Sequence, residues 1–161
     1  MITPTHAFSL ESPIGTLVLG AREDALVRVW LPCEAVPVTS SRSHATPILA
    51  LASQQLSEYF AGERTTFELT TRVEGTVFQQ SVWDQLSRIA YGETITYGEL
   101  ARRVNRPRAY RAVGQANGAN PLPIVVACHR VLASSGLGGY AGGRDTKQAL
   151  LALEEATLAS S

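Results

Sequence analysis

The residues best suited to chemistry lie at Cys128, which ends an apolar run and is followed directly by His129 and Arg130. The thiolate is the reactive form of cysteine, and nearby positive charge lowers the pKa at which it forms. His129 can accept the thiol proton, directly or through a water molecule, when a carboxylate orients the imidazole. A buried, inert cysteine is the alternative, since cysteines often pack inside proteins. No other Cys-His-Arg cluster occurs in the chain, which favours a nucleophile.

A carboxylate for such a nucleophile is available near the end of the chain. After Asp145 the only acidic residues are Glu154 and Glu155. They lie in a stretch, residues 145–156, whose apolar spacing predicts an amphipathic helix. Its inward-facing residues are expected to be Ala149, Leu150 and Leu153. A Cys–His–Glu set is therefore available, and the pattern leaves the choice of glutamate open.

Charge is segregated along the chain, although the net charge is zero. Residues 1–99 carry a net charge of −5, residues 100–147 carry +7 and residues 148–161 carry −2. Nearly all the basic residues are arginine, whose planar fork matches phosphate oxygens and guanine edges. A solvated basic face would look similar, but a cluster confined to one segment is also typical of nucleic-acid binding.

Two short helices are expected inside the basic segment, at residues 97–104 and 109–117. Thr96 can cap the first helix, and Asn105-Arg-Pro107 predicts a turn between the two. The arginines here are Arg102, Arg103, Arg106, Arg108 and Arg111. This arrangement fits a helix-turn-helix, although a helical hairpin that binds nothing has the same pattern.

The N-terminal half predicts mixed strands and helix, with nothing that looks catalytic. Apolar alternation predicts strands within residues 5–31, and a polar loop follows over residues 34–45. Thr46-Pro47 predicts the start of a helix that ends at Gly62, and residues 67–73 form one more candidate strand.

The character of the sequence changes near Glu74-Gly75. Thr76 can cap a helix that runs to about Ile89. We therefore expect two domains, residues 1–73 and residues 74–161.

Several classes of protein are disfavoured. Cys33 and Cys128 form no metal-binding pair, and the histidines His6, His44 and His129 are scattered, so no metal site is expected. No cofactor is expected either, because too little chain follows the glycines near Gly138 to complete a dinucleotide-binding unit. The chain lacks a recognisable secretory signal and a spanning apolar segment, which predicts a cytoplasmic protein.

The nucleophile and the arginines together suggest chemistry on DNA. An enzyme that acts on a base in a duplex must flip that base out of the stack. Arg111 could fill the gap that remains, and Tyr97 and Tyr140 could stack on the base or hydrogen-bond to it. Both tyrosines could equally be half-buried core residues.

The segment Ile124-Val-Val-Ala-Cys-His-Arg-Val131 closely resembles the active-site signature of the O6-alkylguanine-DNA alkyltransferases, also called methylated-DNA–protein-cysteine methyltransferases. The resemblance is specific over about residues 75–156 and compatible over the N-terminal half. Further matching segments, in order, are Phe78-Gln-Gln-x-Val-Trp83, Tyr91-Gly-Glu-Thr-x-x-Tyr97, Arg111-Ala-Val-Gly114, Asn120-Pro121 and Gly139-Tyr-Ala-Gly-Gly143.

The resemblance implies an α+β fold. Residues 1–73 would form a small antiparallel sheet with a helix, ribonuclease-H-like, and residues 74–161 a mainly helical domain with a helix-turn-helix. It also implies irreversible, single-turnover transfer of an alkyl group from O6 of guanine to a cysteine. O4-alkylthymine is left open as a second substrate, and double-stranded DNA would be the partner of a monomeric protein.

The resemblance also assigns roles to residues. Cys128 would be the acceptor, His129 its base acting through water, Glu154 the residue that orients His129, and Asn120 a brace. Arg111 would intercalate, and Tyr97 would rotate the phosphate and donate to the guanine. Further DNA contacts would fall on Gly98, Arg106 and Ser134, and the flipped-base pocket on Tyr140.

Ala127 departs from the family pattern, which has proline before the cysteine. Proline fixes φ and has no N–H, whereas alanine frees the backbone and adds a donor. We expect some loss of preorganisation and slower transfer. Ala141 is a smaller departure, since some members carry a hydroxyl residue there.

Three other functions would use parts of the same pattern. A non-catalytic lesion sensor would lack the cysteine, which is present as Cys128. A transcription factor would need only the helix-turn-helix. A cysteine hydrolase would need an oxyanion hole, which no motif marks.

Overall fold

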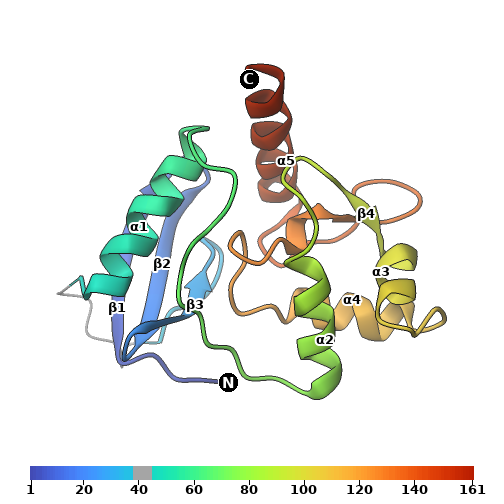
Figure 1. The fold of residues 1–161 in the computed structure, drawn as a ribbon, viewed down its shortest axis with the longest axis horizontal. Helices are drawn as coiled ribbons and strands as arrows, with labels where there is room; N and C mark the ends of the chain where they lie inside the picture. The colour runs from blue at the N-terminus through green and yellow to red at the C-terminus, as the bar shows by residue number, and fades with distance from the viewer. Residues whose placement is uncertain (38–44) are drawn as a thin grey trace. The chain divides into compact units, whose positions relative to one another are not determined.

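A computed structural model describes residues 1–37 and 45–161, which form two compact units, Met1–Glu74 and Gly75–Ser161 (Figure 1). The expected α+β fold is confirmed. His44 and most of the loop expected over residues 34–45 lie outside the described residues. None of the described helices is both long enough and apolar enough to span a membrane.

The first unit is built on an antiparallel sheet with the strand order β1-β2-β3. The strands are β1 (His6–Ser12), β2 (Gly15–Arg22) and β3 (Ala25–Trp30), as the alternating pattern predicts. Tight turns join them, and Glu23 in the second turn adopts a positive φ of 55°. Apolar pairs such as Leu10 and Leu17 face each other across β1 and β2.

Helix α1 (Pro47–Phe60) packs against this sheet (Figure 1). Its start follows the predicted signal, because the Thr46 side chain accepts a hydrogen bond from Leu49 N and Pro47 occupies the first turn. Gly62 has a φ of 74°, a conformation that glycine adopts without strain, and the helix ends just before it.

The strand expected over residues 67–73 is absent. Only Thr71 forms a bridge with Leu26, while Thr70 O and Arg72 N exchange hydrogen bonds with the Leu26 backbone. No residue of this segment is buried. The predicted strand does not form because a segment that buries so little side-chain surface is held to the sheet at a single point.

The second unit is mainly helical. Helix α2 (Val77–Leu86) begins with a reciprocal capping box between Thr76 and Gln79. It ends three residues earlier than expected, and Ile89 is buried from a turn instead. The indole N–H of Trp83 donates to Ala116 O at 2.8 Å and so holds α2 against the helix that contains Ala116.

Helices α3 (Tyr97–Arg103) and α4 (Tyr110–Gly118) form the predicted helical pair. Thr96 caps α3 by accepting a hydrogen bond from Glu99 N. Asn105 turns the chain with a φ of 59°, a left-handed conformation that asparagine tolerates.

A two-residue parallel pairing, β4 (Ile95–Thr96) with β5 (Val131–Leu132), was not predicted. It joins the start of α3 to the segment after Cys128.

The last helix, α5 (Arg144–Ala159), buries a different face from the one expected. Leu150 is buried as predicted, but Ala149 is exposed and Leu153 is only half-buried. The buried positions are Lys147, Leu150 and Glu154. Spacing of apolar residues could not locate this face because two of its three members are charged.

Candidate active site and nucleic-acid interface

Cys128 starts a single turn of 3-10 helix, Cys128–Arg130, and its side chain is buried. The preceding residue, Ala127, has φ −79° and ψ 59°, and Cys128 N donates to Val126 O at 2.8 Å. These values define an inverse γ-turn. Ile124 lies just upstream with a φ of 74°, which strains a β-branched residue. The cysteine is therefore presented by a tightly constrained loop.

Two asparagines hold this loop. Asn120 Nδ2 donates to Val126 O at 2.8 Å, and Asn120 Oδ1 accepts from Leu122 N at 3.0 Å. Asn117 Nδ2 donates to Cys128 O at 3.3 Å from within α4. Asn120 thus lies where the sequence predicted a brace, whereas Asn117 was not identified from the sequence.

His129, Arg130 and Glu154 form one buried cluster. Glu154 Oε1 lies 2.8 Å from His129 Nε2, and the Arg130 guanidinium donates to both carboxylate oxygens at 2.7 to 3.2 Å. Arg130 Nη1 also donates to Ile89 O, and its guanidinium lies over the ring of Tyr91. The structure places Glu154, and not Glu155, beside the imidazole.

The electrostatics of this cluster select the protonation states. Burial alone would raise the pKa of Glu154, but hydrogen bonds from His129 and Arg130 and their charges lower it to about 2. Burial lowers the pKa of His129, although Glu154 opposes this. At neutral pH the imidazole is neutral and faces a carboxylate through Nε2. An ionised carboxylate only accepts hydrogen bonds, so Nε2 carries the proton and Nδ1 is the basic nitrogen.

The basic nitrogen has no hydrogen-bond partner within the described residues. A buried polar atom without a partner is costly unless it has a role. His129 Nδ1 is therefore available to accept a proton.

Burial raises the pKa of the Cys128 thiol. Hydrogen bonding from the side chains of Asn120 and Tyr140 and the positive charge of Lys147 act in the opposite direction. The resting state is a thiol that needs a base, with groups around it that stabilise the thiolate once it forms. The structure thus brings Asn120, predicted as a brace, and Tyr140, predicted to line the pocket for the base, to the thiol.

Tyr97 packs closely against the glycine-rich loop at Gly138. A Cβ on Gly138, where φ is 76°, would lie 3.3 Å from a ring atom of Tyr97 and 3.1 Å from Ala133 N. Only glycine fits this close approach without a shift of its neighbours. Burial raises the pKa of Tyr97, so its phenol stays protonated and can donate.

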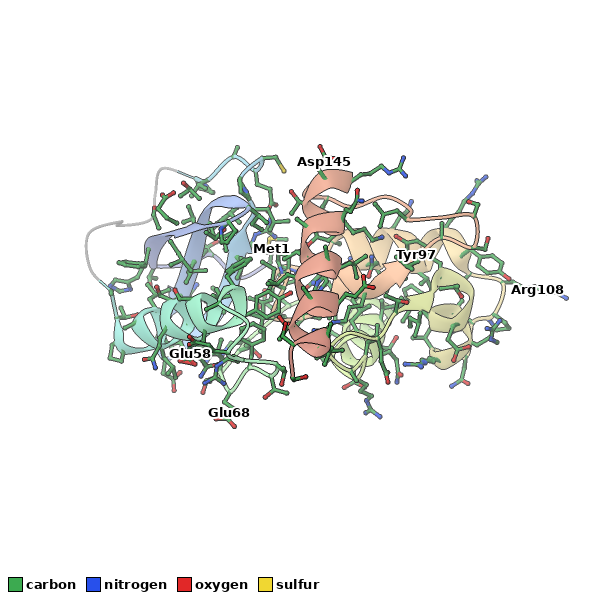
Figure 2. The ribbon with its side chains drawn as sticks, turned by 90° about the horizontal axis from the view of Figure 1, so that it is seen from above. Met1, Glu58, Glu68, Tyr97, Arg108 and Asp145 are labelled. Atoms are coloured by element: carbon green, nitrogen blue, oxygen red, sulfur yellow. The ribbon has the colours of Figure 1, made fainter. Side chains whose placement is uncertain are left out.

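The arginines of the helical pair fall into two groups. Arg102 and Arg103 bind the Glu99 carboxylate at 2.8 and 3.2 Å. In the part of the chain that the structure describes, no hydrogen bond or ion pair holds the exposed side chains of Arg106, Arg108 and Arg111. Figure 2 shows Arg108 at the outer end of the pair, directed away from the unit. Three guanidinium groups are thus available to an anionic partner.

Gly98 and Ser134 are the other predicted contact residues. Gly98 is in the first turn of α3 and Ser134 is exposed in the loop after β5. Among the described residues, no hydrogen bond links Cys128 to Ser134 or Arg111. No group of three or more His, Cys, Asp or Glu side chains in residues 1–37 and 45–161 is placed to hold a metal ion.

In comparisons with known proteins, both units match domains of one family. Residues 77–156 match the family described as 6-O-methylguanine DNA methyltransferase, DNA binding domain, and residues 7–73 match its ribonuclease-like domain. The chain is 48% identical over 147 residues to a constitutive methylated-DNA–protein-cysteine methyltransferase of Bacillus subtilis, covering 88% of this chain and 89% of the relative. The chain belongs to the methylated-DNA–protein-cysteine methyltransferase family.

Other members of the methylated-DNA–protein-cysteine methyltransferase family show the same relationship. The Methanosarcina acetivorans protein is 46% identical and covers 89% of this chain and 94% of its own length. A crystal structure of Mycobacterium tuberculosis OGT in complex with DNA superposes with a TM-score of 0.89 at 42% identity, covering 94% of each chain. The family expected from the sequence is confirmed.

Besides Asn117, two buried charged residues were not identified from the sequence as part of the site. Arg130 was noted only as a cationic neighbour of the thiol, yet it binds Glu154. Lys147 was not singled out, although it is the only lysine in the chain and lies three and seven residues before Leu150 and Glu154. That helical spacing was the available signal.

Proposed function

We propose that this protein repairs DNA by transferring an alkyl group from O6 of guanine to the sulfur of Cys128, once per molecule. The observation that carries the proposal is the buried Cys128 beside a neutral His129 whose basic Nδ1 is set by Glu154. The family membership supports the same reaction, because relatives at 46 to 48% identity are named methylated-DNA–protein-cysteine methyltransferases.

In the proposed reaction, His129 Nδ1 takes the thiol proton through a water molecule. The thiolate attacks the alkyl carbon, a new S–C bond forms and the C–O6 bond breaks. The electron pair of that bond passes to guanine, which gains a proton from the Tyr97 phenol as it departs. The proton held by His129 then restores the phenol through solvent. The net change is conversion of the thiol to a thioether and of O6-alkylguanine to guanine.

Arg130 supports this step by holding the carboxylate. Three hydrogen bonds from its guanidinium fix Glu154 and keep it ionised. The imidazolium that forms during the reaction is then stabilised by an adjacent fixed charge. Since a thioether is not reversed by this site, each molecule acts once.

The partner in this proposal is double-stranded DNA with the alkylated guanine flipped out. Arg111 fills the vacated place, and Tyr97, Gly98, Arg106 and Ser134 contact the strand. Tyr140, which hydrogen-bonds to the thiol, lines the pocket for the base. The unpaired guanidinium groups of the helical pair support this role because phosphates are their natural partners.

Residues 74–161 form the proposed DNA-binding and alkyl-acceptor domain, and residues 1–73 the N-terminal α/β domain. A monomeric state and a cytoplasmic location stay predictions, as does activity on O4-alkylthymine.

The test is an intact-mass measurement after incubation with duplex DNA that carries O6-methylguanine. One methyl group per protein is expected, and it should be lost in Cys128→Ala. Cys33→Ala is the matched control, because Cys33 is an exposed cysteine of the first unit. Multiple turnover or no adduct contradicts the proposal, and the absence of an adduct would leave a lesion sensor or a transcription factor as the alternatives.

A further inference from the structure

We propose that Lys147 is a positioning residue for the alkyl acceptor. Its buried ammonium clamps the segment after Cys128 to the glycine-rich loop and supplies a fixed positive charge that stabilises the thiolate. The inference rests on the proposed function and deepens it by adding a buried cation to the groups that stabilise the Cys128 thiolate.

The clamp is visible in the contacts of the ammonium group. Lys147 is fully buried, and its Nζ donates to Val131 O at 2.5 Å and to Gly139 O at 3.1 Å. Val131 follows the Cys128–Arg130 turn, and Gly139 precedes Tyr140. One side chain from α5 therefore links β5, which follows Cys128–Arg130, to the glycine-rich loop. That loop carries Tyr140, which hydrogen-bonds to the thiol.

The same ammonium also reaches the start of α3. Its nitrogen lies 5.9 Å from the centroid of the Tyr97 ring, within the range of a cation–π contact. Tyr97 is the proposed proton donor to guanine. Lys147 thus contacts three segments: β5 after Cys128, the glycine-rich loop and the start of α3.

The charge of Lys147 is not neutralised by a carboxylate. No acidic side chain of the described residues lies within ion-pair distance of it. A buried cation without a counter-ion is costly, and such groups are usually paired. The group that can become its counter-ion is the Cys128 thiolate.

The mutual effects on pKa agree with this pairing. Burial lowers the pKa of Lys147, and the negative charge of a Cys128 thiolate raises it. Lys147 in turn lowers the pKa of Cys128 against the effect of burial. The positive charge of Arg144, on the same helix, lowers the pKa of Lys147. The positive charge of Lys147 lowers the pKa of His129 and so helps to keep the imidazole neutral.

The first experiment measures the thiol directly, in a Cys33→Ser background so that Cys128 is the only cysteine. The pH dependence of Cys128 alkylation by iodoacetamide, without DNA, gives its titration midpoint. For Lys147→Met we expect the midpoint to rise by about one pH unit or more. Methyl transfer from duplex O6-methylguanine at pH 7 should fall about tenfold or more, with the deficit shrinking as the pH rises.

Two further variants separate charge from packing. Lys147→Arg keeps the charge but changes the donor geometry, so its midpoint should stay near that of the parent while transfer slows. Leu150→Ala is the matched control, because it removes a buried side chain from the same face of α5. It should lower stability without moving the midpoint. A Lys147→Met midpoint equal to that of the parent overturns the proposal.

A second measurement needs no variant of Lys147. Because the chain has one lysine, ¹⁵N-lysine labelling gives a single side-chain ammonium signal. Its chemical shift should titrate with the midpoint of the thiol and should lose this titration in Cys128→Ser. A signal indifferent to Cys128→Ser overturns the proposal even if Lys147→Met does not fold. Neither readout depends on DNA, so a failure here is distinct from a failure of alkyl transfer.

Discussion

The carboxylate of Glu154 meets Nε2 of His129 at 2.8 Å, and this contact decides which imidazole nitrogen is the base. Because the carboxylate is ionised, Nε2 must donate, and Nδ1 becomes the acceptor. Arg130 completes the arrangement by occupying both carboxylate oxygens. The thiol is therefore paired with a base whose tautomer is fixed by a buried salt bridge.

Replacing this carboxylate by an amide tests the tautomer argument. Glu154→Gln can donate to His129 and stabilise the wrong tautomer, so we expect single-turnover methyl transfer to slow by at least about a hundredfold. The variant also leaves Arg130 unpaired, and the free energy of unfolding in urea should fall by about 3 kcal/mol. Glu155→Gln, which changes an exposed neighbour, should retain both values. A Glu154→Gln rate within threefold of the parent would rule out this role.

The same cluster should make the fold sensitive to acid. The pKa of Glu154 is lowered from an ordinary 4.5 to about 2 by its partners. The unfolded chain therefore binds a proton that the folded protein does not, and stability is lost as the pH falls from about 5 toward 2. The loss is on the order of 3 kcal/mol.

His129 adds to the acid sensitivity with the same sign. Burial lowers its pKa below the ordinary 6.5, so as the pH falls below 6.5 the imidazole binds a proton in the unfolded chain but not in the folded protein. Stability therefore falls with the pH. Urea unfolding between pH 7 and pH 3 measures both effects. In Glu154→Gln the decline below pH 5 should flatten, and an unchanged slope there would exclude Glu154 as its source.

Local signals in the sequence predicted much of the fold. Thr46, Thr76 and Thr96 each cap a helix as expected, because capping depends on a side chain and the backbone three residues later. The pairing of β4 with β5 was beyond reach, since two residues carry no periodic pattern. Its partners also lie 36 residues apart in the chain, at Ile95↔Val131 and Thr96↔Leu132.

The buried charges show why the candidate site was only partly predictable. Hydrophobic spacing assigns charged residues to the surface, so it placed Ala149 inside and gave no role to Lys147. Lys147 and Glu154 are buried because each meets polar partners supplied by distant segments, near Val131 and Arg130. Such partners follow from the tertiary fold and not from local pattern.

Duplex and free-base substrates should separate the role of Arg111 from the chemistry. Arg111 has no ion pair among the described residues and lies in the first turn of α4. If it fills the space of a flipped base, Arg111→Ala should slow transfer from duplex DNA about tenfold or more. Transfer from free O6-benzylguanine should be unchanged, because no base needs to be flipped. Arg102→Ala is the control, since Arg102 already binds Glu99. Equal losses on both substrates would contradict the assignment.

Ala127 stands where the family pattern has proline, and its backbone already has a geometry that proline accepts. Its φ of −79° lies within the range of the pyrrolidine ring. The N–H of Ala127 donates no hydrogen bond within the described residues, so the ring removes none.

Ala127→Pro should therefore stabilise the fold and quicken the reaction. Lower entropy of the unfolded chain should raise the free energy of unfolding by about 0.5–1 kcal/mol. Because the inverse γ-turn at Ala127 presents the thiol, a stiffer turn should also speed single-turnover methyl transfer by a few-fold. Urea unfolding and rapid-quench rates check the two effects separately. A rate that is unchanged or lower, in a variant that is more stable, would show that alanine at this position does not limit the preorganisation of Cys128.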